Sequence, residues 1–176
     1  MKLFEKFAWA NLRAAWGALV CGVLFACAAR GDEISGEAVV NGGGTVSFAG
    51  ASSTNWIDGD LVLTYSNATA TSSFTLPGLS MARILAVGGG GGGGGSRLRA
   101  NSAGGGGGGG GLVETNALLS GATYEVSVGA GGAGGSTSNS SARPGTSGGD
   151  STIRTSGGEA VVTAVGGGGG GGYGDG

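Results

Sequence analysis

Residues 83–95 read RILAVGGGGGGGG, a short run of β-type residues that passes directly into eight glycines. The same transition occurs at residues 124–135 (YEVSVGAGGAGG) and at residues 160–172 (AVVTAVGGGGGGG). A further glycine run, residues 104–111, instead precedes a strand-like Leu-Val pair. Valine, isoleucine and tyrosine favour strands. The repeated junctions therefore predict one domain in which short strands lead into and out of glycine segments.

Residues 32–76, upstream of these junctions, alternate polar and apolar residues between turn signals. The Asn-Gly dipeptide at 41–42 and the Asp-Gly dipeptide at 58–59 favour the tight turns of β-hairpins. Every second residue from Leu61 to Tyr65 is large and mostly apolar, as on the buried face of a strand. Beyond the amino-terminal region no segment has a helical period, and glycine inside a helix costs about 1 kcal/mol relative to alanine. The expected fold class is all-β, with short antiparallel strands.

Glycine makes up 46 of the 176 residues, far above ordinary usage. Proline occurs twice and no strict three-residue repeat runs through the chain, which excludes collagen. Glycine runs are either disordered or form the extended polyglycine II type of helix, which rises about 3.1 Å per residue. Such rods can pack backbone to backbone through lateral hydrogen bonds, which offset the loss of chain entropy. Since linkers usually mix serine with glycine and do not alternate with strands, the sequence favours packed polyglycine II rods supported by the strands.

The amino terminus has the parts of a secretory signal peptide. Basic residues lie near its start, residues 14–29 are apolar, and small residues offer cleavage sites after Ala28 or Gly31. This apolar run is shorter than the about 20 residues that span a membrane as a helix. We therefore predict a helical signal peptide at 1–31 and an exported mature chain, extracellular or at a bacterial cell surface, without a membrane span.

A lipoprotein signal is the alternative interpretation of the same region. Residues 24–27 (LFAC) resemble a lipobox whose Cys27 would carry a lipid anchor, although Phe25 stands where a small residue is usual. Both cysteines, Cys21 and Cys27, lie inside the signal. The mature chain is therefore expected to have no disulfide, thiol nucleophile or cysteine metal site.

The expected domains are the signal peptide at 1–31, an amino-terminal β-hairpin segment at 32–59 and a glycine-rich domain at 60–176. The chain stops just after its last glycine run. We expect further sequence there, as in a fragment of a longer surface protein.

The charge of the mature chain limits its partners and its chemistry. Removing the signal takes four of nine basic residues and one of eleven acidic residues, which leaves five against ten and a net charge of about −5. A sparse acidic surface argues against nucleic acid, which requires clustered Lys and Arg. The mature chain has no His, Cys or Lys, the residues that supply common bases, thiol nucleophiles and Schiff-base amines. We expect no enzyme, no catalytic residue, no cofactor and no metal.

Three short motifs have an alternative chemical interpretation. Asp58 and Asp60 flank a glycine and could act as a carboxylate pair, but Asp-Gly is also an ordinary hairpin turn. The octaglycine at 88–95 matches G-x-G-x-x-G by default, yet the dinucleotide fingerprint requires a helix immediately afterwards. The words around Asp150 and Asp175 resemble calcium-binding nonapeptide repeats without their full spacing. In each case the structural interpretation is favoured.

Two connecting loops, residues 96–103 and 136–147, combine charge with apolar residues. If the glycine runs are rods, both loops lie at one end of them, and loops on a rigid scaffold are where binding sites concentrate. Plain connectors are an equally good interpretation. The candidate binding residues are Arg97, Leu98, Arg99, Asn101 and Arg143. Any ligand is expected at a cell surface or in the extracellular medium.

From about residue 61 onward the sequence resembles the glycine-rich domains of phage tail-fibre adhesins and of bacterial surface proteins, and more distantly that of anaplastic lymphoma kinase. The resemblance is carried by residues 74–78, 83–95, 104–113, 124–135, 148–153 and 164–172. It implies a β scaffold that supports packed polyglycine helices and serves as an adhesive or spacing module. Phage adhesins have no secretion signal, so the predicted signal indicates a cell-encoded product.

The sequence thus predicts an exported, non-enzymatic, glycine-rich structural or adhesive surface module. The alternative is a disordered glycine-rich linker or matrix segment of a larger exported protein. Amide exchange separates the two, since packed rods protect glycine amides and a linker does not.

Processing of the predicted signal is tested by amino-terminal sequencing of exported protein. We expect the first residue to be Ala29 or Asp32, because small residues precede both positions. A lipid-blocked terminus at Cys27 would establish the lipoprotein alternative. Retention of Met1 would refute both.

Overall fold

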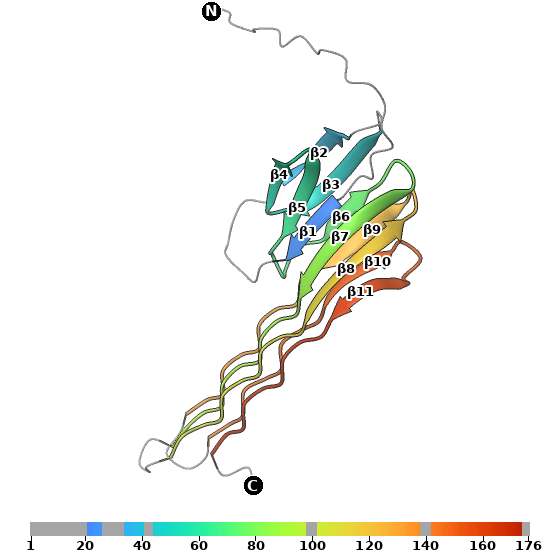
Figure 1. Ribbon diagram of the computed structural model, residues 1–176. Coiled ribbons are helices and arrows are strands. Elements are labelled where there is room, and N and C mark those ends of the chain that lie inside the picture. The colour runs from blue at the N-terminus through green and yellow to red at the C-terminus, as the bar shows by residue number, and fades with distance from the viewer. Residues whose placement is uncertain (1–20, 26–33, 41–43, 98–101, 138–141, 174–176) are drawn as a thin grey trace, which may run out of the picture.

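A computed structural model describes residues 21–25, 34–40, 44–97, 102–137 and 142–173. In these ranges the chain forms eleven strands in two sheets and no helix. The glycine segments project from one end of the sheets as a bundle of extended chains (Figure 1). The predicted all-β class is confirmed for this part of the chain, and the strand pairs are antiparallel except those of one strand.

The first sheet has five strands in the order β4-β5-β1-β7-β8. The strands β4 and β5 form an antiparallel pair, as do β7 and β8, whereas β1 runs parallel to both of its neighbours. The bounds are β1 Cys21–Phe25, β4 Ser53–Ile57, β5 Asp60–Tyr65, β7 Ser80–Val87 and β8 Leu112–Leu119.

The second sheet has six strands in the order β11-β10-β9-β6-β3-β2, and every neighbouring pair is antiparallel. The bounds are β2 Ile34–Val39, β3 Thr45–Ala51, β6 Ser72–Thr75, β9 Thr123–Ser127, β10 Ser151–Thr155 and β11 Ala160–Ala164. This sheet supplies three consecutive strands, β9, β10 and β11, at the side from which glycine segments leave.

Strand β1 differs from the expectation of a helical signal peptide. Gly22 pairs with Val62 of β5 on one side and with Arg83 of β7 on the other. The facing edges of β5 and β7 carry rows of backbone donors and acceptors, and an extended segment between them satisfies both rows. The remaining residues of the predicted signal, 1–20 and 26–31, lie outside the described residues. Cleavage and the lipid anchor at Cys27 therefore stay predictions.

The two predicted hairpins join the strands that the sequence indicated. β2 and β3 pair on either side of the turn at 41–43, which lies outside the described residues. β4 and β5 are joined by Asp58 and Gly59, whose φ angles are 52° and 90°. Positive φ at both central residues is the requirement of a type I′ turn. Asp58 therefore serves the turn, as the Asp-Gly signal predicted.

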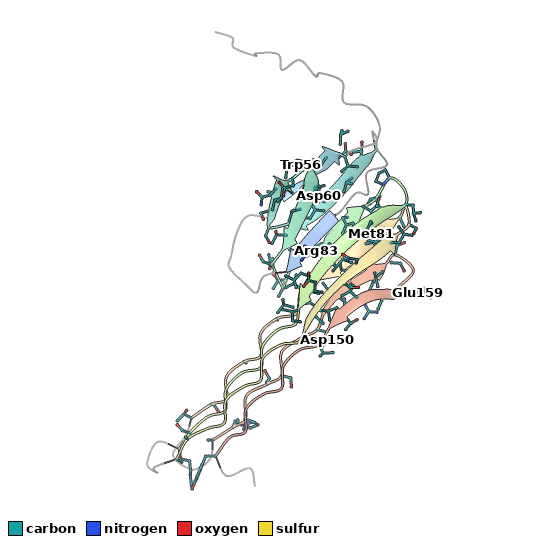
Figure 2. The ribbon with its side chains drawn as sticks, viewed as in Figure 1. Trp56, Asp60, Met81, Arg83, Asp150 and Glu159 are labelled. Atoms are coloured by element: carbon teal, nitrogen blue, oxygen red, sulfur yellow. The ribbon has the colours of Figure 1, made fainter. Side chains whose placement is uncertain are left out.

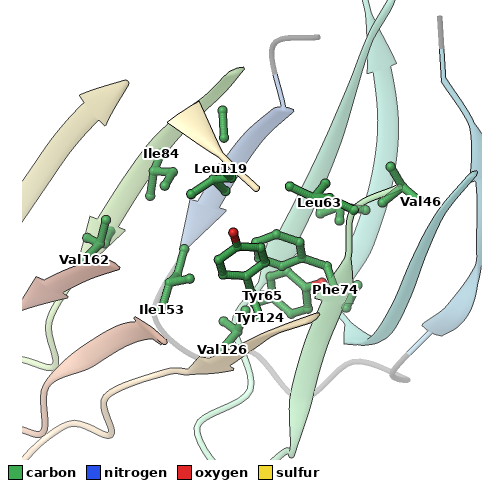
Figure 3. Packing of buried hydrophobic residues seen from close by; sticks show 14 of the residues in the cluster. Val46, Leu63, Tyr65, Phe74, Ile84, Leu119, Tyr124, Val126, Ile153 and Val162 are labelled. Atoms are coloured by element: carbon green, nitrogen blue, oxygen red, sulfur yellow. The ribbon is translucent and has the colours of Figure 1, made fainter. Parts of the chain in front are cut away.

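The two sheets pack face to face around one apolar core (Figure 3). Alternate residues of β5 from Leu61 to Tyr65 are at most 1% exposed, which confirms the predicted buried face. From the other sheet, the rings of Phe74 and Tyr124 stack with centroids 5.1 Å apart. The Tyr65 hydroxyl donates to the carbonyl of Ser73 at 3.0 Å, so the polar end of this buried ring is satisfied.

The strands next to the glycine segments continue past the sheets as extended chains, which we call rods. In chain order these are rod 1 (88–95), rod 2 (104–111), rod 3 (129–136), rod 4 (143–150) and rod 5 (166–172). Rods 1, 3 and 5 leave the ends of β7, β9 and β11, whereas rods 2 and 4 return to β8 and β10 (Figure 1).

The sequence predicted four glycine stretches, so rod 4 is a correction. Most of it was assigned to the loop at 136–147. The carbonyl of Thr146 accepts a hydrogen bond from Gly92 of rod 1 at 2.9 Å, and Gly148 donates to Gly167 of rod 5 at 2.8 Å. These bonds make residues 143–150 part of the bundle.

Candidate functional site

Rod 1 lies at the centre of the bundle and bonds to each of the other four rods. Its amides donate to two of them. To rod 2 the bonds are Gly88 N to Gly111 O (2.8 Å), Gly91 N to Gly108 O (2.8 Å) and Gly94 N to Gly105 O (2.7 Å). To rod 4 they are Gly89 N to Gly149 O, Gly92 N to Thr146 O and Gly95 N to Arg143 O, each 2.9 Å. Each set recurs at every third residue.

The carbonyls of rod 1 accept from the remaining two rods with the same period. From rod 3 the bonds are Gly132 N to Gly90 O (2.8 Å) and Gly135 N to Gly93 O (2.7 Å), and from rod 5 they are Gly167 N to Gly89 O and Gly170 N to Gly92 O, both 2.8 Å. Three residues per turn is the period of the polyproline II family of helices. Successive residues of rod 1 therefore point at different neighbours.

This packing leaves no room for a side chain at most positions of rod 1. A Cβ at Gly91 would lie 2.0 Å from the carbonyl oxygen of Gly168 in rod 5. A Cβ at Gly92 would lie 2.0 Å from that of Ala133 in rod 3. At Gly109 of rod 2, by contrast, a Cβ would meet nothing within 4 Å. The glycine requirement is therefore strict at some positions and absent at others.

Rods 3 and 4 show why the sequence interpretation missed rod 4. In rod 3, Ala130 and Ala133 are exposed and lie three residues apart. In rod 4, Gly145 and Gly148 face rod 1, where a Cβ would lie 2.1 Å from a carbonyl oxygen, while the residues between them are not glycine. At the edge of such a bundle only one residue in three must be glycine. Rod 4 therefore contains no long glycine run, and the sequence interpretation took it for a loop.

Ser151 and Asp150 hold the junction between the sheets and the rods. Ser151 is fully buried, and its hydroxyl donates to the carbonyl of Val87 at 2.6 Å and accepts from the amide of Gly129 at 2.9 Å. It thereby joins the start of rod 1 to the start of rod 3. The Asp150 carboxylate accepts from the amide of Gly166 at 2.8 Å, at the start of rod 5. Asp150 thus has a structural contact, and the sequence analysis did not single out Ser151.

The far end of the rods brings together two of the predicted binding residues. The carbonyl of Arg143 accepts from Gly95, and the amide of Tyr173 donates to the carbonyl of Gly95 at 3.2 Å. The guanidinium of Arg97 lies 5.9 Å from the centre of the Tyr173 ring. The Arg143 side chain is exposed and Arg97 is half-buried. We call these three residues, Arg97, Arg143 and Tyr173, the tip cluster.

Leu98, Arg99 and Asn101 lie outside the described residues, so their predicted role is untested. Side chains gather on the sheets and at the far end of the rods, with few between (Figure 2). Within the described ranges no three metal-ligating side chains form a group. No helix in those ranges is long and apolar enough to cross a membrane.

Most of the chain matches a known protein family. Residues 64–176 match the family model of the glycine-rich domain, which covers more than half of the chain. The chain belongs to the glycine-rich domain family. No curated protein and no solved structure matches the chain. The matched region of this glycine-rich domain includes all five rods and the strands that they extend.

A matched pair of substitutions tests the packing of the rods. We expect Gly91→Ala to lower the free energy of unfolding by about 1–3 kcal/mol, because the added methyl overlaps the Gly168 carbonyl. Gly109→Ala adds the same methyl to open space and should be neutral or stabilising by about 0.4–1 kcal/mol through the unfolded chain. Urea unfolding followed by circular dichroism measures both. Equal effects would contradict the packed arrangement.

Ser151→Ala tests the junction. The substitution leaves the buried amide of Gly129 without its partner, so we expect a loss of about 1–3 kcal/mol in unfolding free energy and faster exchange of that amide. The control is Ser127→Ala at the end of β9, where the side chain is exposed. A Ser151→Ala variant as stable as this control would show that the hydroxyl contributes nothing.

Proposed function

We propose that the protein is an exported, non-enzymatic surface module, in which polyglycine II-type rods form a stiff spacer that holds binding loops away from the β-sandwich. The observation that carries the proposal is the set of lateral hydrogen bonds around rod 1. Eight residues rising about 3.1 Å each give a spacer of about 25 Å.

Order in the rods is supported by the balance of entropy and hydrogen bonding. Fixing a residue costs about 1–2 kcal/mol, and a hydrogen bond returns about 0.5–1.5 kcal/mol net. Gly89 and Gly92 each donate one bond and accept another, and both are buried. For these two residues the bonds are of the same order as the cost of fixing the backbone, whereas an isolated glycine chain has no such bonds.

The charge of the tip cluster supports a binding role. Arg97 and Arg143 lie at the far end of the rods, and no acidic residue lies in the described parts of the two adjoining loops. The described acidic residues instead lie on the sheets, in their connections and at Asp150. An acidic protein with a cationic, partly aromatic tip favours an anionic ligand at a cell surface.

Membership of the glycine-rich domain family is compatible with both candidate roles, the surface module and the linker segment. The finer resemblance to phage tail-fibre adhesins and bacterial surface proteins, carried by the strand-to-glycine words, favours an adhesive or spacing module. The second candidate remains a linker or matrix segment of a larger exported protein. In that case the glycine amides would exchange as in an unfolded chain.

Two double variants of equal charge test adhesion through the tip. We expect Arg97→Ser with Arg143→Ser to weaken binding of the fluorescently labelled exported protein to cells about tenfold, which corresponds to about 1.4 kcal/mol. Arg83→Ser with Arg154→Ser removes the same charge from exposed positions on the sheets and should bind as the parent does. Flow cytometry on bacterial and eukaryotic cells measures binding.

Thermal melting accompanies the binding assay, since neither pair should unfold the protein. The Arg97–Tyr173 contact is worth only about 0.5–1 kcal/mol at an exposed site. Equal loss of binding in both pairs would attribute adhesion to net charge rather than to the tip. A parent that binds none of the cells would refute the adhesive role and leave the spacer.

A further inference from the structure

Rod 1 has one side on which its backbone groups hold no hydrogen bond. The amides of Gly90 and Gly93 have no partner among the described residues, although the amides on either side of each are bonded. The carbonyls of Gly88, Gly91 and Gly94 likewise accept no hydrogen bond there. A central rod with such a row of unused groups has an incomplete set of neighbours.

The three-residue turn explains where the incomplete side lies. Three residues per turn aim the amides in three directions and the carbonyls in three others, which gives six neighbour positions. Rods 2 and 4 accept from rod 1, and rods 3 and 5 donate to it, so four positions are filled. Rod 2 also accepts no bond from rod 3, whereas rods 3 and 4, rods 4 and 5, and rods 2 and 5 are bonded. The two open positions therefore lie between rods 2 and 3.

Glycine on this side is not required by packing within the molecule. A Cβ at Gly90 or Gly93 would lie 3.7 Å from the nearest atom, an ordinary contact. A Cβ at Gly131 or Gly134 in rod 3 would lie 3.8 Å from the nearest atom. Alanine at such positions stabilises a protein by about 0.4–1 kcal/mol through the unfolded state. These four glycines thus lower stability relative to alanine, and packing within the molecule does not require them.

Rod 5 carries the complementary groups. The carbonyls of Gly166 and Gly169 accept no hydrogen bond from the described residues and lie three residues apart, as Gly90 and Gly93 do. On its outer side, a Cβ at Gly168 or Gly171 would meet nothing within 4 Å. Rod 5 of one molecule therefore presents a smooth row of acceptors with the period of the free donors of rod 1.

We propose that a second copy of this chain docks its rod 5 in the open position of rod 1 that adjoins rod 3, where Gly90 and Gly93 donate to the partner's carbonyls. Rod 5 already packs against rod 1 within the molecule through Gly167 and Gly170. The new contact repeats this rod-to-rod chemistry at a vacant position. Because the donor face and the acceptor rod are different surfaces, the contact is head-to-tail, the type that builds rings or open filaments.

Sedimentation velocity over a concentration series tests the contact on the exported full chain. We expect the parent to associate as concentration rises, and Gly90→Ala with Gly93→Ala to weaken association at least tenfold because two methyls block close approach. Gly106→Ala with Gly109→Ala is the matched control, since these positions on rod 2 meet nothing within 4 Å and lie away from rod 3. Both variants should melt at or above the temperature of the parent.

Residue-level amide exchange gives a second readout. In dilute protein, Gly90 and Gly93 should exchange fast while Gly91 and Gly92 are protected, and the first two should slow at least tenfold on association. A parent that stays monomeric at every concentration, or an alanine pair on rod 1 that associates like the parent, would overturn the proposal. Fast exchange at Gly91 and Gly92 would instead refute the ordered rods, and the proposed spacer with them.

Discussion

The lateral hydrogen bonding of rod 1 is the interaction on which the glycine-rich part of the structure depends. Gly89, Gly92 and Gly95 are buried among other backbones rather than among side chains. Their peptide groups must find partners there, because a buried unpaired amide or carbonyl costs about 1–3 kcal/mol. The surrounding rods supply those partners only if nothing projects from the Cα atoms of these three glycines. The absence of a side chain at these positions is therefore required for the hydrogen bonds between the rods.

The β-sandwich must deliver the rods at backbone contact distance, although packed sheets lie about 10 Å apart. The buried faces of two strands show how the gap closes. On β7 the inward residues are Ile84, Ala86 and then Gly88, and on β11 and its extension they are Val162, Ala164 and then Gly166. Side-chain volume falls at each step towards the rods. The recurring Ala-Val-Gly sequences, 86–88 and 164–166, contain the last steps of this decrease in side-chain volume.

The strands also set the register of the rods. The antiparallel pair β7–β8 continues as rods 1 and 2, which bond to each other from Gly88 to Gly111 onward, directly after Val87 pairs with Leu112. Each rod therefore enters the bundle already aligned with a neighbour. Closing a long glycine loop costs entropy, and this cost grows slowly with loop length. The contacts between the rods, which begin at the sheet, offset it. Ser151 adds a side-chain link between rods that belong to different sheets.

Much of the fold could be predicted because its signals are local. The Asp-Gly turn, the alternation along β5 and the strand-to-glycine junctions are each readable within about ten residues. Rod 4 was missed because its two glycines, Gly145 and Gly148, are required by packing against rod 1, which is distant in sequence. Of the candidate site, Arg97 and Arg143 lie at one end of the rods, as the loop positions indicated, and their binding role stays a prediction. Tyr173 was not identified there, since its contact with Arg97 joins residues 76 positions apart.

The edges of the bundle differ in a way that resembles the edges of a β-sheet. Exposed sheet edges invite pairing with other chains, and proteins usually block them with proline, charge or bulky side chains. Rod 4 has such residues on its exposed side, including Pro144, Thr146 and Asp150. The face of rod 1 that carries Gly90 and Gly93 has neither side chains nor charge over it. Since alanine would fit there and glycine costs stability, the difference between the two sides follows from a need for close approach on one of them.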